Sequence, residues 1–235
     1  MNANKKTARI VGVLFIIATT FFMIGQSFYE PIMTSEMVLE NAYPERIVIL
    51  TGILIEFFAV CAIILIPAFL YPVLKKDNEA LALGYAGFRF LEAGFLAIVM
   101  AGTLALINIS QNFIDMGRID ASYYSILVNG IQSMNSWAFM ISVSFLFPVG
   151  AMILYFMMYR TRLIPNFLSV WGFLAAALLI VGVVLMIFEV FSGVSPSLLE
   201  VTFALPIAVQ EMVMAIWLIF KGFNPSAIAP SSAKK

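Results

Sequence analysis

The sequence contains no histidine, a single cysteine and very little charge. Without histidine the chain cannot build a His-ligated zinc or haem site, nor a serine and histidine pair of the rhomboid type. Cys61 alone cannot form an intramolecular disulfide. The long apolar stretches contain no aspartate and no central lysine, which excludes an intramembrane aspartyl dyad and a retinal-type Schiff base. We therefore expect no metal site and no cofactor.

Charged residues make up only 11% of the 235 residues, hydrophobic residues make up 63%, and the mean hydropathy is +1.02. A water-soluble domain of this length cannot bury so much apolar surface, so the sequence predicts an all-α, polytopic membrane protein. The net charge is zero and the basic residues are scattered at helix ends, which argues against nucleic acid as a partner. The partner that the composition requires is membrane lipid.

Six stretches are long enough to cross a membrane, because a spanning helix needs about 20 mostly apolar residues. We expect helices at about 8–29, 46–73, 80–108, 130–159, 166–190 and 199–220. They form a bundle in a single domain, residues 1–223, whose longest connection, 109–129, has room for a short surface helix. The segment 224–235 contains proline, serine and alanine and is expected to be a disordered tail.

Lysine and arginine fall almost entirely on one side of the predicted helices. The residues on that side are Lys5, Lys6, Arg9, Lys75, Lys76, Arg160, Arg162, Lys221, Lys234 and Lys235. Cytoplasmic loops near helix ends collect positive charge, so the N-terminus and the C-terminus are both expected in the cytoplasm. Six crossings are consistent with that orientation.

Four charged residues lie in the middle of the predicted spans, away from their ends: Glu56, Arg89, Glu92 and Glu211. Counting about 1.5 Å per residue from the predicted helix ends places each of them roughly 14 to 18 Å deep, close to the midplane. A charge at a helix centre costs roughly 2.5 to 3.5 kcal/mol, so these side chains should face the bundle interior. We expect them to form one cluster.

The predicted cluster has more acids than bases. Arg89 and Glu92 stand three residues apart, share a helix face with Tyr85 and can pair. One arginine cannot neutralise three glutamates in a low dielectric. We therefore expect Glu56 or Glu211 to hold a proton, or a cationic ligand or ion to supply the missing charge.

Polar groups on the outer side extend the predicted site. Gln132 and Asn135 belong to an unusually polar outer half of the fourth helix, which should face the bundle interior or a water-filled vestibule. Pro206, five residues before Glu211, frees the carbonyl of Thr202 in the sixth helix. Polar groups above the charges outnumber those below, so we expect any cavity to open outward.

The chain also resembles a known family, in the stretches KKTARIVGVLFI, FRFLEA, LIPNFLSVWGFLAA and QEMVMAIWLIFKGF. Over about residues 5–223 it is similar to the bacterial six-helix membrane proteins called domain of unknown function 4386. The resemblance implies a six-helix bundle in a bacterial cytoplasmic membrane, with matched positions at Arg89, Glu92 and Glu211, and it implies no particular activity. Similar proteins often have a histidine where this chain reads SMNSW, which argues against histidine-dependent chemistry here.

The interpretation we prefer is a protein that binds or transports a small polar or cationic molecule, or protons, at the Glu and Arg cluster. Arg89 would anchor a carboxylate, and Glu56 and Glu211 would be the protonatable members.

In one alternative, a structural or regulatory protein, the buried charges only hold the helices together. In another, an intramembrane lipid-modifying enzyme, glutamates act as acid and base, but no nucleophile signature accompanies them, so an enzyme is less favoured. Six helices make a small transporter, so transport would favour a homodimer.

Overall fold

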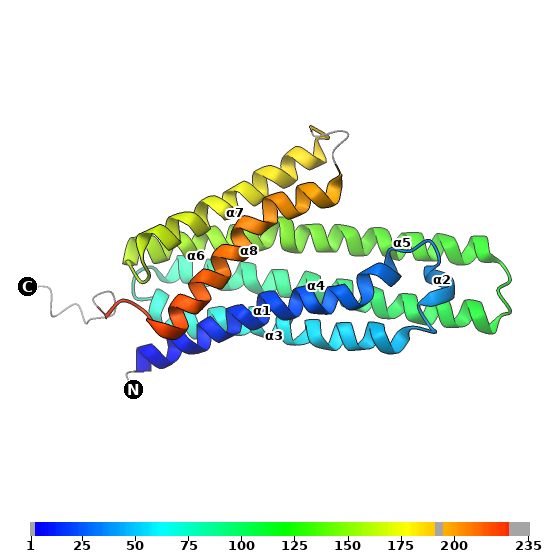
Figure 1. Ribbon diagram of the computed structural model, residues 1–235, viewed down its shortest axis with the longest axis horizontal. Helices are drawn as coiled ribbons and strands as arrows, with labels where there is room; N and C mark the ends of the chain where they lie inside the picture. The colour runs from blue at the N-terminus through cyan, green and yellow to red at the C-terminus, as the bar shows by residue number, and fades with distance from the viewer. Residues whose placement is uncertain (1–2, 191–194, 226–235) are drawn as a thin grey trace, which may run out of the picture.

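The computed structural model describes residues 3–190 and 195–225, and within these ranges the chain forms helices and no strand (Figure 1). The element order is α1 (Ala3–Met33), α2 (Val38–Asn41), α3 (Arg46–Leu74), α4 (Glu79–Asp115), α5 (Ala121–Phe139), the π-helix η1 (Met140–Leu146), α6 (Phe147–Thr161), α7 (Asn166–Ile187) and α8 (Pro196–Phe220).

Six helices in the described part of the chain are long and apolar enough to cross a membrane, which confirms the predicted polytopic all-α fold. They are α1, α3, α4, the continuous rod formed by α5, η1 and α6, α7, and α8. The rod and α4 are longer than expected, with 41 and 37 residues. At about 1.5 Å per residue they greatly exceed the ~30 Å hydrocarbon core.

The extra length comes from the segment expected to be a long connection, 109–129. α4 continues to Asp115 and α5 begins at Ala121, so most of that segment is helical. The tail expected at 224–235 lies outside the described residues from position 226 onward.

The start of α1 and the end of α8 lie together, at what we call the inner end of the bundle. Nε of Arg9 donates a hydrogen bond to the main-chain oxygen of Ile219 at 3.2 Å. At the opposite, outer end, α4 and α5 extend with α2 well beyond α7 and α8 (Figure 1). The bundle is therefore much longer on the side of α4 and α5.

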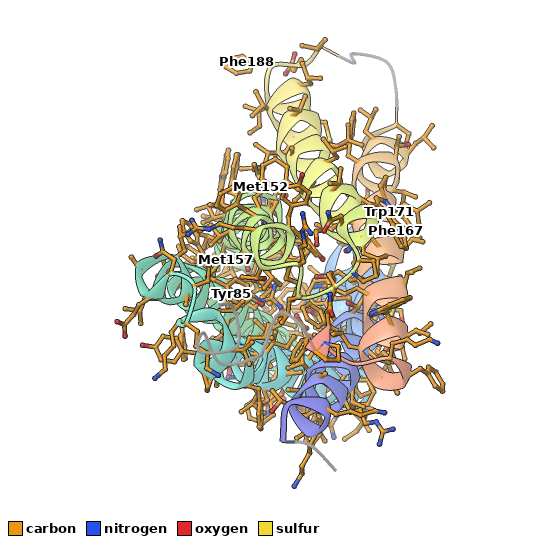
Figure 2. The ribbon with its side chains drawn as sticks, turned by 90° about the vertical axis from the view of Figure 1, so that its left-hand side faces the viewer. Tyr85, Met152, Met157, Phe167, Trp171 and Phe188 are labelled. Atoms are coloured by element: carbon orange, nitrogen blue, oxygen red, sulfur yellow. The ribbon has the colours of Figure 1, made fainter. Side chains whose placement is uncertain are left out.

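α8 contacts α1 near the inner end and leaves it toward the outer end. A Cβ atom on Gly12 would lie 2.6 Å from the main-chain oxygen of Ala215, so the two backbones meet there. Further out, α8 packs on α7, where the ring of Phe203 lies against Gly182. Figures 1 and 2 show α7 and α8 leaning away from the other helices, with Phe188 at the far end of α7. This divergence makes room for a cavity.

The rod changes its helical pattern beside the candidate site. The main-chain N–H of Phe147 donates to the oxygen of Ser142, five residues earlier, as in a π-helix. Pro148 has no N–H to offer the carbonyl of Ser144, so the α-helical pattern cannot pass unbroken through this segment. Ser142 Oγ donates to the main-chain oxygen of Glu92 at 2.9 Å, which joins η1 to α4.

Candidate functional site

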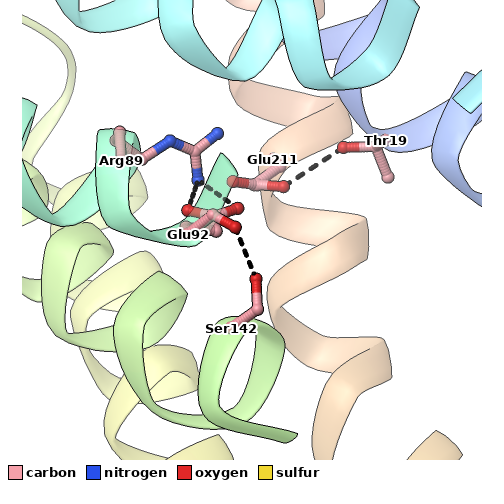
Figure 3. Close-up of polar contacts among 5 residues, drawn as sticks. All are labelled: Thr19, Arg89, Glu92, Ser142 and Glu211. Carbon is pink, nitrogen blue, oxygen red and sulfur yellow. Dashed lines mark hydrogen bonds and ion pairs between the residues drawn. The ribbon is translucent and has the colours of Figure 1, made fainter. Parts of the chain in front are cut away.

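Arg89 and Glu92 form an ion pair within α4 (Figure 3). Nη1 of Arg89 lies 3.0 Å from Oε2 of Glu92 and 3.3 Å from Oε1, and the two side chains are only 4% and 5% exposed. The spacing of three residues places both on one face of the helix. Because both partners belong to α4, the pair does not tie this helix to a neighbour.

Glu211 reaches the same place from α8. Its Oε2 accepts a hydrogen bond from Oγ1 of Thr19 on α1 at 3.2 Å (Figure 3). Arg89 is close enough to interact electrostatically with Glu211, yet in the described part of the chain the ion pair of Arg89 is with Glu92. The cluster therefore has two carboxylates for one guanidinium, and Glu211 is the carboxylate without an ion pair.

Aromatic side chains surround the guanidinium. Cζ of Arg89 lies 5.5 Å from the ring centroid of Phe147, within the range of a cation–π interaction. Tyr85 lies one turn before Arg89 and is buried among the helices seen end-on in Figure 2. Its hydroxyl and Nε of Arg89 have no hydrogen-bond partner among the described residues. Buried polar groups without a hydrogen-bond partner are uncommon, so two unsatisfied polar groups lie at the cluster.

A cavity of about 290 Å³ reaches the cluster. α1, α3, α4, η1, α6, α7 and α8 all contribute to its lining. Four lining residues are polar or charged, namely Thr19, Arg89, Glu92 and Glu211, and the rest of the lining is apolar. The cavity thus has apolar walls and one ionic, hydrogen-bonding region.

The mouth of the cavity lies between the outer halves of α1 and α8. Met23, Val201 and Leu205 line the cavity and are 62%, 59% and 55% exposed. Such apolar residues on spanning helices face the hydrocarbon. The cavity therefore opens sideways toward lipid, whereas the excess of polar groups above the charges predicted an outward opening.

The structure places Glu56 apart from this cluster. It is fully buried between α3 and α1, where its Oε2 accepts a hydrogen bond from the hydroxyl of Tyr29 at 2.5 Å. At about 1.5 Å per residue, Glu56 lies about 27 Å from the inner end of α3, whereas Arg89 lies about 15 Å from the inner end of α4. Three of the four predicted members are together, and Glu56 forms a separate contact.

Gln132 and Asn135 also lie away from the cavity. Nε2 of Gln132 donates to the main-chain oxygen of Met33 at 2.7 Å and so satisfies a carbonyl at the end of α1. The amide of Asn135 lies against Gly102 of α4. Both contacts join the outer part of the rod to its neighbours, and neither residue lines the cavity.

Sequence reasoning did not single out Thr19 or Ser142. The one signal for Thr19 is the pair of threonines in the apolar run of α1. Thr20 bonds back to the main-chain oxygen of Ile16 at 2.7 Å, whereas Thr19 turns to Glu211. For Ser142 the available signal is Pro148, which disturbs the helix just before it.

The chain was compared with protein families, curated proteins and solved structures. No curated protein and no solved structure matched it. Residues 10–222 match the family described as domain of unknown function (DUF4386), and this match extends from within the first spanning helix to just beyond the last. The chain belongs to this family.

Proposed function

We propose that the protein binds a membrane-soluble amphiphile whose cationic, hydrogen-bond-donating group meets Glu211 and whose apolar part fills the cavity between α1 and α8. The observation that carries this proposal is the lipid-facing cavity of about 290 Å³ that ends on buried charges. From the side on which the basic residues gather, we also infer that both termini lie in the cytoplasm. The family resemblance implies that the membrane is a bacterial cytoplasmic membrane.

The charge balance favours a cation. Arg89 and Glu92 neutralise one another within α4, which leaves Glu211 with one neutral donor, Thr19. A carboxylate can accept several hydrogen bonds, and an uncompensated charge in a low dielectric is costly. A protonated amine would supply both the charge and the donors that Glu211 lacks.

The walls favour a ligand with a sizeable apolar part. Small residues, Ala18, Ala204 and Ala208, line the cavity from α1 and α8 and leave space between these helices. An amphiphile dissolved in the bilayer is already concentrated at the lateral mouth and needs no path through water. Recognition would then depend on the ionic end of the cavity, since apolar walls accept many shapes.

The alternative of a purely structural role has less support. Buried charges hold helices together when partners come from different helices, but Arg89 and Glu92 share α4. Enzymatic chemistry also has less support, because the nearby hydroxyls of Thr19 and Ser142 both donate to acceptors of the protein. Ser142 donates to a main-chain carbonyl, which is not a base, and the carboxylate of Glu211, which accepts from Thr19, receives no further hydrogen bond among the described residues that would orient it as a general base.

The test is equilibrium binding of a radiolabelled long-chain alkylammonium ion to the full chain in lipid nanodiscs, with empty nanodiscs subtracted. The alcohol and the carboxylate of equal chain length serve as neutral and anionic probes. We expect saturable binding of the ammonium ion and at least tenfold weaker binding in Glu211→Gln. Glu56→Gln removes a buried carboxylate that does not line the cavity, so this matched control should bind as the unmodified protein does.

Filling the cavity offers a second variant. Ala208→Phe adds volume to the lining without changing charge and should abolish binding of the ammonium ion. The proposal fails if the alcohol binds as tightly as the ammonium ion, or if Glu211→Gln and Ala208→Phe both retain full affinity.

A further inference from the structure

A second cavity, of about 330 Å³, lies at the inner end of the bundle. It is formed where the turn between α6 and α7 meets the end of α8, and it shares no lining residue with the lipid-facing cavity. Its charged lining residues are Arg162 and Lys221, and Trp217 and Asn166 also line it. No acidic residue is part of this lining.

The backbone fixes the shape of this inner cavity. Arg162 ends α6 in the left-handed conformation, with φ 54°, and so turns the chain toward α7. On the other rim Gly222, with φ 80°, turns the chain after α8. The main-chain N–H of Asn224 then donates to the oxygen of Leu163 at 2.9 Å, which joins the two rims.

The two basic side chains of the inner cavity have no acidic partner in the described ranges. The ion pair found at this end joins Arg160 to Asp77 at 3.3 Å and involves neither Arg162 nor Lys221. Lys5 lies next to Gly222, with its Cγ atom 3.6 Å from where a Cβ of that glycine would be, and adds positive charge. The inner cavity is therefore positive and not neutralised from within the described protein.

The first turn of α7 adds donors. Pro165 precedes the helix and offers no side-chain cap, and the main-chain N–H groups of Asn166 and Phe167 have no acceptor among the residues described. The positive end of the helix dipole points the same way. Asn166 lines the inner cavity, so an anion there would lie beside the start of α7 as well as Arg162 and Lys221.

We propose that the inner cavity binds the phosphate-bearing headgroup of an anionic phospholipid. Arg162 and Lys221 contact the phosphate, and the ring of Trp217 lies at the depth of the lipid glycerol, where tryptophan is common in membrane proteins. Basic residues near a cytoplasmic helix end are ordinary, so charge alone would indicate no site. Here they line a cavity between helix ends, which is the arrangement that binds anionic headgroups.

The test uses the full chain with Trp137→Phe and Trp171→Phe, so that Trp217 is the remaining tryptophan. The protein is placed in liposomes in which brominated phosphatidylglycerol or brominated phosphatidylcholine quenches its fluorescence. We expect stronger quenching by the anionic lipid. Arg162→Gln and Lys221→Gln should each lower the relative affinity for phosphatidylglycerol about fivefold.

A matched control is the pair Lys75→Gln and Lys76→Gln, which removes two positive charges from the same end but outside the inner cavity. It should leave the preference for phosphatidylglycerol unchanged. Equal quenching by both lipids, or an equal loss in the Lys75 and Lys76 control, would overturn the proposal. Relief of quenching by millimolar inorganic phosphate would also overturn it, because the site would then hold a soluble anion. None of these outcomes bears on alkylammonium binding at Glu211.

Discussion

The hydroxyl of Thr19 on the first helix donates a hydrogen bond to the carboxylate of Glu211 on the last helix, at 3.2 Å. This contact crosses the lipid-facing cavity at its ionic end, where α1 and α8 begin to diverge. A single neutral hydroxyl is a weak partner for a carboxylate. The contact thus closes the bundle without satisfying Glu211.

Replacing Glu211 by glutamine should barely change stability. The amide oxygen of Glu211→Gln can still accept from Thr19, and interhelical hydrogen bonds of this kind contribute only about 0.6 kcal/mol on average. We expect a thermal midpoint in detergent within about 2 °C of the unmodified protein. A loss of several degrees would instead mean that Glu211 is part of the packing of the bundle.

Arg89 should be far less tolerant of replacement when changed alone. Arg89→Met leaves Glu92 buried without its ion-pair partner, a change that typically costs about 3 kcal/mol or more. The double variant Arg89→Met and Glu92→Leu should recover most of that loss, because Glu92 no longer remains as a buried carboxylate that has lost its ion-pair partner. Thermal unfolding of both variants in detergent tests this, and equal midpoints for the two would contradict the buried pair.

The contact between α1 and α3 should be sensitive to a single methyl group. A Cβ on Gly25 would lie 2.8 Å from the main-chain oxygen of Gly52, whereas a Cβ on Gly94 meets nothing within 4 Å. We expect Gly25→Ala to lower the free energy of unfolding by about 1 to 3 kcal/mol. Gly94→Ala is the matched control and should be neutral, so similar effects of both would argue against the close approach.

Tyr29 should matter more than an exposed tyrosine. Tyr29→Phe removes the hydroxyl that donates to Glu56, whose other carboxylate oxygen already lacks a partner in the described structure. Leaving a buried acceptor unsatisfied costs about 1 to 3 kcal/mol. Tyr159→Phe, at a side chain that is 49% exposed, should change the thermal midpoint little. Comparable shifts in the two variants would speak against the buried contact.

Spin labels can test the direction in which the lipid-facing cavity opens. A label at Leu205→Cys, in a Cys61→Ser background, should be relaxed by oxygen and not by a water-soluble nickel chelate, because the mouth faces hydrocarbon. A label at Ser125→Cys should be relaxed by the chelate, since α5 extends beyond the hydrocarbon there. Strong relaxation of the Leu205 label by the chelate would mean that the cavity opens to water.

The sequence was sufficient to predict the six spans and the inward position of the buried charges. Both follow from large free energies of transfer into the membrane, which depend little on how the helices pack. About 20 apolar residues are needed to cross the hydrocarbon core, and charged side chains avoid lipid. The pairing of Arg89 with Glu92 was equally predictable, because helix geometry alone brings positions three apart together.

The position of Glu56 was not predictable in this way. Depth was counted from the predicted helix ends, from the outer end for Glu56 and from the inner end for Arg89. The two counts do not share a reference level, because α4 is 37 residues long and its outer end does not lie level with that of α3. Only the inner ends provide a common reference, and counted from there Glu56 lies about 12 Å further out than Arg89. The surroundings of Glu56 also depend on which helices pack together, because Tyr29 of α1 donates the hydrogen bond to Glu56.

The cavity itself was beyond sequence reasoning. It results from the divergence of α8 from α1, which depends on the contact at Gly12 near one end and on Phe203 at Gly182 near the other. Small residues at these positions are visible in the sequence, but their partners are not. Thr19 becomes part of a site only through that geometry.

The π-helix beside Glu92 sets the rotation of one half of the fourth span against the other. A π-helix has more residues per turn than an α-helix, so η1 changes the rotation of α5 about the rod axis relative to α6. If the seven residues Met140–Leu146 were wound as an α-helix instead, the part of the rod before them would be rotated relative to α6, because an α-helix turns about 100° per residue and a π-helix turns less. Asn135 would leave Gly102 while Gly150 kept its place against Phe88 on α4. The same segment that carries Ser142 thus keeps two contact surfaces of one continuous rod in register with α4.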